Sequence, residues 1–268
     1  EFLFYQLAAN KSRLINSAGG AAQKNLLLGE LRKFEVAVPT MPMQTRICSI
    51  LSAYDDLIEN NRRRIALLEE AARQLYKEWF VRFRFPGHEH VKIIDGVPEG
   101  WSNEPLFELA KPTYGYAFKS TLFSDEQIGK PVVRIRDVPN RESGTWTSEE
   151  APEDKLLENG DFLIGMDGDF HMNYWAGGQA WLNQRVVRLA GGHRMTTGLL
   201  RSSVEQQIKD LNETITGTTV KHLGAKHLKQ IKLLVPPEAL LLQANEFFEQ
   251  SRQLIVSLSV VNRKLAQA

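Results

Sequence analysis

The chain has 268 residues, enough for two domains, and its 43% hydrophobic and 24% charged side chains are typical of an ordinary globular protein. The 33 Lys and Arg residues against 32 Asp and Glu leave a formal net charge of +1, which neither indicates nor excludes a nucleic-acid partner. Because Cys48 is the single cysteine, disulfides and thiolate metal sites within the chain are excluded. No apolar run has membrane-spanning length and no signal peptide is visible, so we expect a cytoplasmic protein.

The first forty residues predict a helix, a loop and a strand. Phe2–Ser17 has an amphipathic helical pattern, and residues 18–26 have the composition of a loop. The alternating segment Phe34–Pro39 predicts a strand that ends on a proline.

A single long helix is predicted from Pro42 to Arg84. Its length would be about 60 Å at about 1.5 Å per residue, and Phe85-Pro86-Gly87 ends it. The apolar positions follow heptad steps, which predicts a partner helix; a long surface helix packed on one domain is the alternative. Asn61 in this seam is expected to fix the register. The seam residues expected to pair are Ile47, Leu51, Tyr54, Ile58, Asn61, Ile65, Leu68 and Leu75.

A mixed domain follows the turn that ends in Trp101. Alternating or apolar runs predict strands at residues 132–136, 161–164, 183–189 and 230–235, and a helix at residues 198–211. A second long helix is predicted over residues 238–268. Its expected pairing stripe is Phe247, Leu254, Leu258, Val261 and Leu265.

An internal repeat connects the two halves of the chain. Residues 20–26 align with residues 217–223 at an offset of 217 − 20 = 197, and the offset continues to Pro39 and Pro236. The order of helix, glycine-containing loop, strand, proline and long helix therefore occurs twice. This predicts an α+β fold in which two similar domains are related by a pseudo-two-fold axis and their long helices pair antiparallel as a coiled coil.

Residues 88–197 have no first copy, so we expect the first domain to lack its front portion in this chain. The predicted divisions are a domain remnant at 1–40, a central spacer helix at 41–86, a complete recognition domain at 87–236 and a C-terminal spacer helix at 237–268.

Several motifs together resemble the specificity (S) subunits of type I restriction–modification enzymes. They are Gln44-Thr45-Arg46-Ile47, the run from Ile50 to Asn61, Trp79-Phe80-Val81 with Phe85-Pro86, Pro98-Glu99-Gly100-Trp101, Gly160–Ile164 with Asp167-Gly168, and Leu182-Asn183-Gln184-Arg185. The resemblance covers essentially the whole chain. It implies target-recognition domains that each read half of a split DNA sequence, held apart by two helices.

The resemblance also implies partners and cofactors. A methyltransferase (modification) subunit and a restriction subunit would dock on this chain, which would itself be non-catalytic. S-adenosylmethionine, ATP and magnesium are expected only on those partner subunits. No membrane partner is expected, and self-association through the exposed partial domain is left as an open alternative.

The candidate DNA-binding residues fall into four groups. Arg134 and Arg136 alternate with apolar residues on the predicted strand, so both side chains would lie on one face. That face is a candidate DNA surface because arginine contacts guanine or phosphates; a solvated surface strand is the alternative. Tyr114, Tyr116 and Lys119 lie in a segment that suits a groove-entering loop, although core packing of a ring fits equally. Lys24 and Lys221, equivalent in the repeat, are candidates for phosphate contacts. The fourth group consists of polar and aromatic residues on one turn, Asp167, Asp169, His171, Asn173 and Trp175.

Two other classes of protein are alternatives, a metal-dependent nuclease and a structural adaptor. Asp137, Glu153 and Lys155 have the spacing of a metal-dependent nuclease, but Pro152 precedes the glutamate and no apolar strand carries it. A purely structural coiled-coil adaptor is the other alternative, and the complete mixed domain after Trp101 argues against it.

Overall fold

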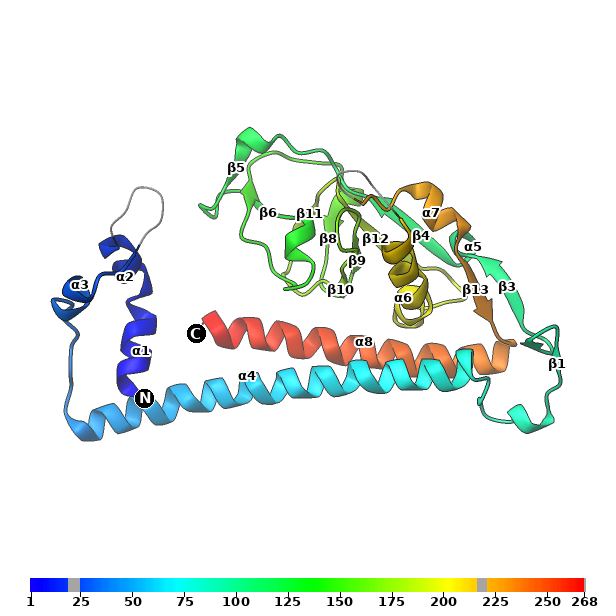
Figure 1. Ribbon diagram of the computed structural model, residues 1–268, viewed down its shortest axis with the longest axis horizontal. Helices are drawn as coiled ribbons and strands as arrows, with labels where there is room; N and C mark the ends of the chain where they lie inside the picture. Colours follow the sequence, from blue (N-terminus) through cyan, green and yellow to red (C-terminus); the bar gives the residue numbers. More distant parts are fainter. Residues whose placement is uncertain (19–24, 216–220, 268) are drawn as a thin grey trace. The chain divides into compact units, whose positions relative to one another are not determined.

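The computed structural model describes residues 1–18, 25–215 and 221–267 (Figure 1). Contacts divide the chain into unit 1, which is Glu1–Asn60 with the last residues of the chain, and unit 2, which is Asn61–Lys264. In the part that is described, no helix is both long and apolar enough to span a membrane.

The elements have the following bounds. The α-helices are α1 (Phe2–Ala9), α2 (Lys11–Ser17), α3 (Leu28–Arg32), α4 (Met41–Tyr76), α5 (Leu106–Leu109), α6 (Thr197–Thr214), α7 (Ala225–Gln230) and α8 (Glu238–Gln267). A π-helical turn is η1 (Lys77–Val81), and 3-10 turns are η2 (His88–His90), η3 (Ser120–Leu122), η4 (Ile135–Asp137) and η5 (Glu153–Lys155). The strands are β1 (Ile93–Ile94), β2 (Val97–Pro98), β3 (Ser102–Pro105), β4 (Ala110–Tyr114), β5 (Phe123–Ser124), β6 (Lys130–Val133), β7 (Trp146–Thr147), β8 (Leu156–Leu157), β9 (Phe162–Gly165), β10 (Met172–Tyr174), β11 (Ala180–Leu182), β12 (Val186–Gly191) and β13 (Lys232–Val235).

Unit 1 begins with two short helices where the sequence predicted one. Asn10 separates α1 from α2, and its side-chain amide donates to the Gln6 carbonyl at 2.8 Å. Asparagine competes in this way with the backbone hydrogen bonds of a helix. The Tyr5 hydroxyl donates to the Asp55 carboxylate at 2.8 Å, which joins α1 to α4 and raises the pKa of Tyr5 to about 12.

The predicted strand Phe34–Pro39 is wrong, and the repeat explains why. Its second copy is β13, which pairs antiparallel with β3. Among the described residues of unit 1, no strand lies beside residues 34–39, so that segment has no ladder partner. The side chains of this segment are also more exposed than those of β13. Val38 is 68% exposed, whereas its counterpart Val235 is 1% exposed.

The repeat itself is visible in the helices. Helix α3 begins at Leu28 and α7 at Ala225, an offset of 225 − 28 = 197. The long helices α4 and α8 begin at Met41 and Glu238, the same offset of 238 − 41 = 197.

The predicted long helix is confirmed with a different ending. The α-helical part, α4, ends at Tyr76, and the π-helical turn η1 follows it directly up to Val81, short of the predicted end at Arg84. The chain then reverses around Trp101, whose ring centroid lies 5.2–5.7 Å from those of Phe80, Phe83 and Phe85.

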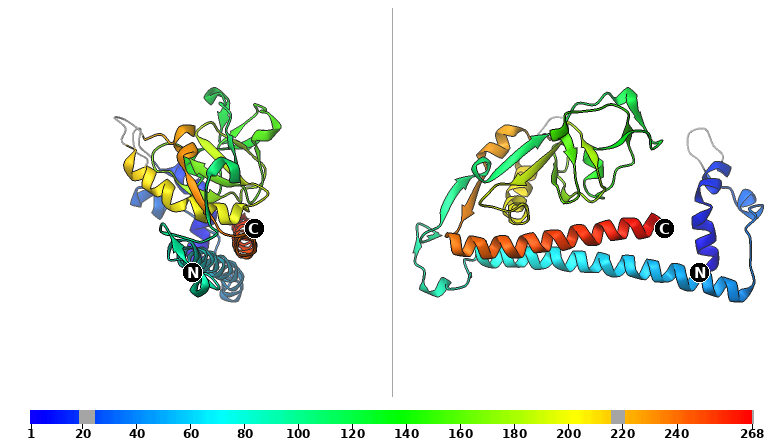
Figure 2. Two further views of the ribbon diagram at one scale, coloured as in Figure 1. Left: turned by 90° about the vertical axis from the view of Figure 1, so that its right-hand side faces the viewer. Right: turned by 180° about the vertical axis from the view of Figure 1, so that it is seen from behind.

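Within unit 2, α4 and α8 run antiparallel (Figures 1 and 2). Asn61 is 3% exposed, and its amide donates to Asn262 Oδ1 at 2.9 Å. Ala72 of α4 enters the same core as Phe248 and Ile255 of α8, with Ile65, Leu68 and Leu75 half-buried beside them. The antiparallel pairing and the placement of Asn61 in the seam are therefore confirmed, and its partner Asn262 was not predicted.

Two parts of the predicted pairing are wrong. Leu254 and Val261 are 50% and 40% exposed, because α8 turns its neighbouring face, with Phe248 and Ile255, toward both α4 and the mixed domain. Leu51 and Tyr54 are 36% and 39% exposed within unit 1, which does not fit the predicted burial in a helix seam. Ile47 is half-buried. Ile58, Leu258 and Leu265 are half-buried, and Phe247 packs at the edge of the core.

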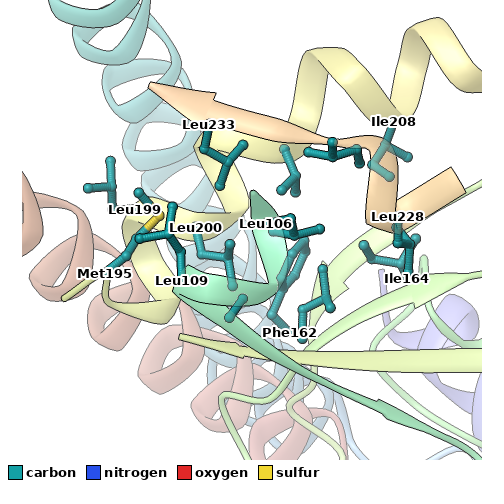
Figure 3. Packing of buried hydrophobic residues seen from close by; sticks show 14 of the residues in the cluster. Leu106, Leu109, Phe162, Ile164, Met195, Leu199, Leu200, Ile208, Leu228 and Leu233 are labelled. Carbon is teal, nitrogen blue, oxygen red and sulfur yellow. The ribbon is translucent and has the colours of Figure 1, made fainter. Parts of the chain in front are cut away.

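The mixed domain contains two principal sheets. One is fully antiparallel with strand order β10-β9-β12-β4, and the other has the order β5-β7-β6-β11-β8 with β11 parallel to β6. Strand β9 joins their cores, because Phe162 and Ile164 face one hydrophobic cluster and Leu163 faces another. Figure 3 shows Phe162 and Ile164 packed with Leu106, Leu109 and residues of α6. The predicted strand at 161–164 and the helix at 198–211 are thus confirmed.

Candidate nucleic-acid interface

A groove of about 410 Å³ opens on the five-stranded sheet. Its lining contains three arginines and two amides and, among the described residues that line it, no carboxylate. The lining residues are Phe118, Ser120, Phe123, Arg134, Ile135, Arg136, Asn183, Gln184 and Arg185. Guanidinium and amide groups are the side chains that most often read base edges, so this groove has suitable chemistry for DNA.

Arg134 and Arg136 reach the groove from a turn and not from a strand. The predicted strand is wrong beyond β6, because η4 follows it directly. The buried Asp137 carboxylate accepts the Arg134 backbone N–H at 2.8 Å and so closes this turn. Burial raises the pKa of Asp137, although that hydrogen bond opposes the rise.

The two guanidinium groups have different surroundings. Arg134 stacks its guanidinium over the Phe123 ring at 5.6 Å from the centroid. Arg136 donates to Thr145 Oγ1 at 2.9 Å, yet its side chain is 65% exposed. Both arginines therefore keep donors available at the groove.

The third arginine, Arg185, was missed as a binding residue. It lies in the turn between β11 and β12, where Gln184 N–H donates to the Tyr116 carbonyl at 2.9 Å. Its guanidinium lies 3.2 Å from the Asp167 carboxylate and is 53% exposed. The motif Leu182-Asn183-Gln184-Arg185 was the available signal, but the sequence could not show that this turn meets Arg134.

Asp167 contacts the groove residue Arg185 but does not itself line the groove. Its carboxylate is 18% exposed and lies 2.6 Å from His222 Nδ1, in addition to its contact with Arg185. Lys221 next to His222 directs its ammonium group to the Asn212 carbonyl. That hydrogen bond uses one of the three N–H donors of the ammonium group. Lys24 lies outside the described residues.

The aromatic candidates are divided between core and surface. Tyr116 is half-buried, and its ring centroid lies 4.9 Å from that of Phe118, a lining residue of the groove. The Tyr114 hydroxyl is buried without a hydrogen-bond partner in the described structure, and burial raises its pKa. Lys119 is exposed close to the groove.

The polar turn from Asp167 to Trp175 does not act as one surface. Asp169 and His171 are exposed. Trp175 is 1% exposed and its indole N–H donates to the Gly178 carbonyl at 2.6 Å, which does not fit the predicted DNA contact. Asn173 is also engaged inside the protein, because its carboxamide accepts from Arg141 and donates to Pro139.

A further basic segment was missed. Lys226, Lys229 and Lys232 lie on or directly after α7, are exposed, and form no ion pair within the described ranges. Figures 1 and 2 show α7 on the side of unit 2 that faces away from α4 and α8. These lysines could contact phosphates without sequence preference.

The nuclease alternative gains no support from the structure. Asp137 closes the η4 turn, Lys155 pairs with Asp154 at 2.6 Å, and Glu153 is exposed. In the ranges that are described, no three His, Cys, Asp or Glu side chains are grouped to hold a metal ion.

Comparison with known proteins gives a consistent result. The family model described as a type I restriction modification DNA specificity domain matches residues 1–70. The specificity subunit of the type I restriction enzyme EcoBI from Escherichia coli is 31% identical over 152 residues, 56% of this chain and 32% of that protein. The MjaIX specificity subunit from Methanocaldococcus jannaschii is 25% identical over 261 residues, 90% of this chain and 60% of that protein. The chain is thus similar to type I specificity subunits, over residues 1–70 in the family model and over longer stretches in the two relatives.

A solved structure has a similar fold. The crystal structure of a type I restriction–modification S subunit from M. genitalium matches 98% of this chain and 70% of that chain, with a TM-score of 0.54 and 18% sequence identity. The names of the relatives agree with the prediction of a specificity subunit. The chain spans about a third and three fifths of the length of the two curated relatives (32% and 60%).

Proposed function

We propose that this chain reads one half of a bipartite DNA target through the groove that contains Arg134, Arg136 and Arg185. The observation that carries the proposal is the convergence of these three arginines, from two separate turns, on one groove whose described lining residues include no carboxylate. An arginine side chain can donate two hydrogen bonds to one guanine, and the side-chain amides of Asn183 and Gln184 can form two hydrogen bonds with adenine. The similarity to type I specificity subunits supports the same proposal.

The chain would recognise DNA without catalysing a reaction. A methyltransferase subunit and a restriction subunit would dock on it and supply S-adenosylmethionine, ATP and magnesium. Helices α4 and α8 would separate this half-site from a second one, and the complex would act in the cytoplasm. Readers of two half-sites on one duplex lie one helical turn apart, about 34–36 Å, or a multiple of it.

The test starts with selection of a preferred sequence from a pool of random duplexes by the purified chain. Titration of the selected duplex with Arg136→Ala and Arg185→Ala should then show a loss of about 1–3 kcal/mol for each, with relaxed preference at one base position. Scrambled duplexes should bind the variants and the wild type almost equally.

Arg64→Ala is the matched control, since Arg64 is exposed on α4 and does not line the groove. Its affinity and base preference should equal those of the wild type. Unchanged base preference in both groove variants would show that another surface reads the DNA.

A further inference from the structure

The loop from Arg134 to Thr145 carries the groove arginines at one end and a different arginine at the other. Its first residues line the groove. Arg141, five residues after Arg136, points instead toward the helices and is 15% exposed. One short loop thus touches both the candidate DNA surface and the helix pair.

Arg141 makes one hydrogen bond to each of three elements. Its Nε donates to Asn173 Oδ1 in β10 at 2.7 Å, its Nη1 to Ser259 Oγ in α8 at 2.5 Å, and its Nη2 to Glu69 Oε1 in α4 at 2.7 Å. A planar guanidinium directs these donors in fixed directions, which a lysine ammonium on a flexible stem does not.

The backbone and charge of Arg141 indicate that its surroundings hold it in place. Its φ is 60°, in the left-handed region that residues other than glycine rarely adopt. Burial lowers the pKa of Arg141, and the carboxylate of Glu69 opposes that effect. A buried charge persists only where partners compensate it, so the three contacts must form together.

The loop between its two ends is braced along its length. The Pro139 carbonyl accepts from Asn173 Nδ2 at 3.0 Å, and Ser143 Oγ donates to the Val132 carbonyl at 2.6 Å. Arg136 donates to Thr145 within the same loop. These hydrogen bonds connect the loop from Arg134 to Thr145 with β6 and β10.

We propose that Arg141 is a positioning residue that fixes the arginine groove relative to the antiparallel helices α4 and α8. The role of the groove rests on the proposed function, whereas the contact itself does not. By holding the groove at one angle, Arg141 would set the distance from this half-site to whatever is bound farther along the helices.

A distance measurement tests this directly. In a Cys48→Ser background of the full chain, spin labels at Glu153→Cys beside β8 and Ser257→Cys in α8 report on the groove-bearing sheet and the helix. Both sites are exposed. The labelled chain that keeps Arg141 should give one narrow distance distribution. Arg141→Ala should at least double the width of that distribution or add a second peak.

Three further variants separate positioning from loss of folding. Glu142→Ala, an exposed neighbour in the same loop, should leave the width unchanged. Glu69→Gln keeps an acceptor and should broaden the distribution less than Arg141→Ala, whereas Arg141→Lys should broaden it more than Glu69→Gln. If Arg141→Ala fails to fold by thermal melting, these two variants decide the matter, and unchanged widths in variants that fold would overturn the proposal.

A DNA arm separates this proposal from the proposed function. Because Arg141 does not line the groove, Arg141→Ala should bind the duplex selected by the wild-type chain within about threefold of the wild-type affinity. If the wild type selects no sequence, the proposed function fails while the distance measurement still decides the role of Arg141. A tenfold loss of affinity with an unchanged distance would make Arg141 a DNA contact and overturn its positioning role.

Discussion

Two of the three groove arginines contact a carboxylate that does not itself line the groove. Asp137 closes the turn that carries Arg134, and Asp167 pairs with Arg185. Both carboxylates are largely covered. They can orient the arginines without presenting a negative surface that would repel phosphates.

Gly115 is the residue on which the Arg185 turn depends most directly. A Cβ at Gly115 would lie 2.0 Å from the Asn183 carbonyl oxygen, so Gly115→Ala must displace the turn that carries Gln184 and Arg185. We expect a loss of about 1–3 kcal/mol in the free energy of unfolding, measured by denaturant titration. Gly144→Ala is the control, since no atom lies within 4 Å of its Cβ, and equal stability of the two variants would contradict the described turn.

Among the elements, α8 offers a test of which face is buried. Ile255 is 2% exposed, whereas the adjacent Leu254 is 50% exposed. Ile255→Ala should therefore cost about 2–5 kcal/mol of unfolding free energy, and Leu254→Ala no more than about 0.5 kcal/mol. Chemical denaturation of both variants measures the difference, and a larger cost for Leu254→Ala would restore the stripe predicted from sequence.

The contact between α6 and α8 should depend on pH. The Glu249 carboxylate accepts from the Gly198 N–H at 3.1 Å and from Arg252. Burial alone would raise the pKa of Glu249, but these partners outweigh it and hold the pKa below its usual value of 4.5. A depressed pKa contributes stability above the unfolded-state pKa, and that stability is lost as the pH falls through the folded-state pKa.

The stability difference between wild type and Glu249→Gln should accordingly be largest near neutral pH and shrink below about pH 4. Thermal melting at several pH values measures it. A difference that does not vary between pH 3 and pH 7 would show that the ionisation of Glu249 contributes nothing to this contact.

Sequence periodicity predicted the long helices, because their apolar residues repeat regularly along the chain. Helices α4, α6 and α8 follow from their apolar repeats, and the Asn61 register follows from the seam. The strand over Phe34–Pro39 could not be predicted correctly, because a strand depends on a pairing partner that lies elsewhere in the chain. The α8 stripe failed for a related reason: Leu254 and Ile255 are both apolar, and only the second neighbour of the helix decides which is buried.

The candidate site was predictable only in part. Arg134 and Arg136 were identified from their residue types, but the turn that orients them depends on the buried Asp137. Arg185 comes from a turn about fifty residues away in sequence, and no local pattern shows that the two turns meet. Trp175 illustrates the converse, since a ring that suited a DNA surface lies in the core.

At the scale of the whole molecule, a net charge of +1 conceals an uneven distribution. Three arginines line one groove, and Lys226, Lys229 and Lys232 are exposed on or next to α7. Such local positive charge can attract DNA even when the overall charge is close to zero.

The central claim is that the arginine groove contacts DNA, and photocrosslinking tests it most directly. A benzoylphenylalanine placed at Gln184, an exposed residue that lines the groove, should crosslink to the selected duplex at one preferred position. The same photoreactive residue at Ser257, exposed on α8, should give no crosslink. Efficient crosslinking from Ser257 with none from Gln184 would contradict the account and move the DNA surface from the groove to the helices.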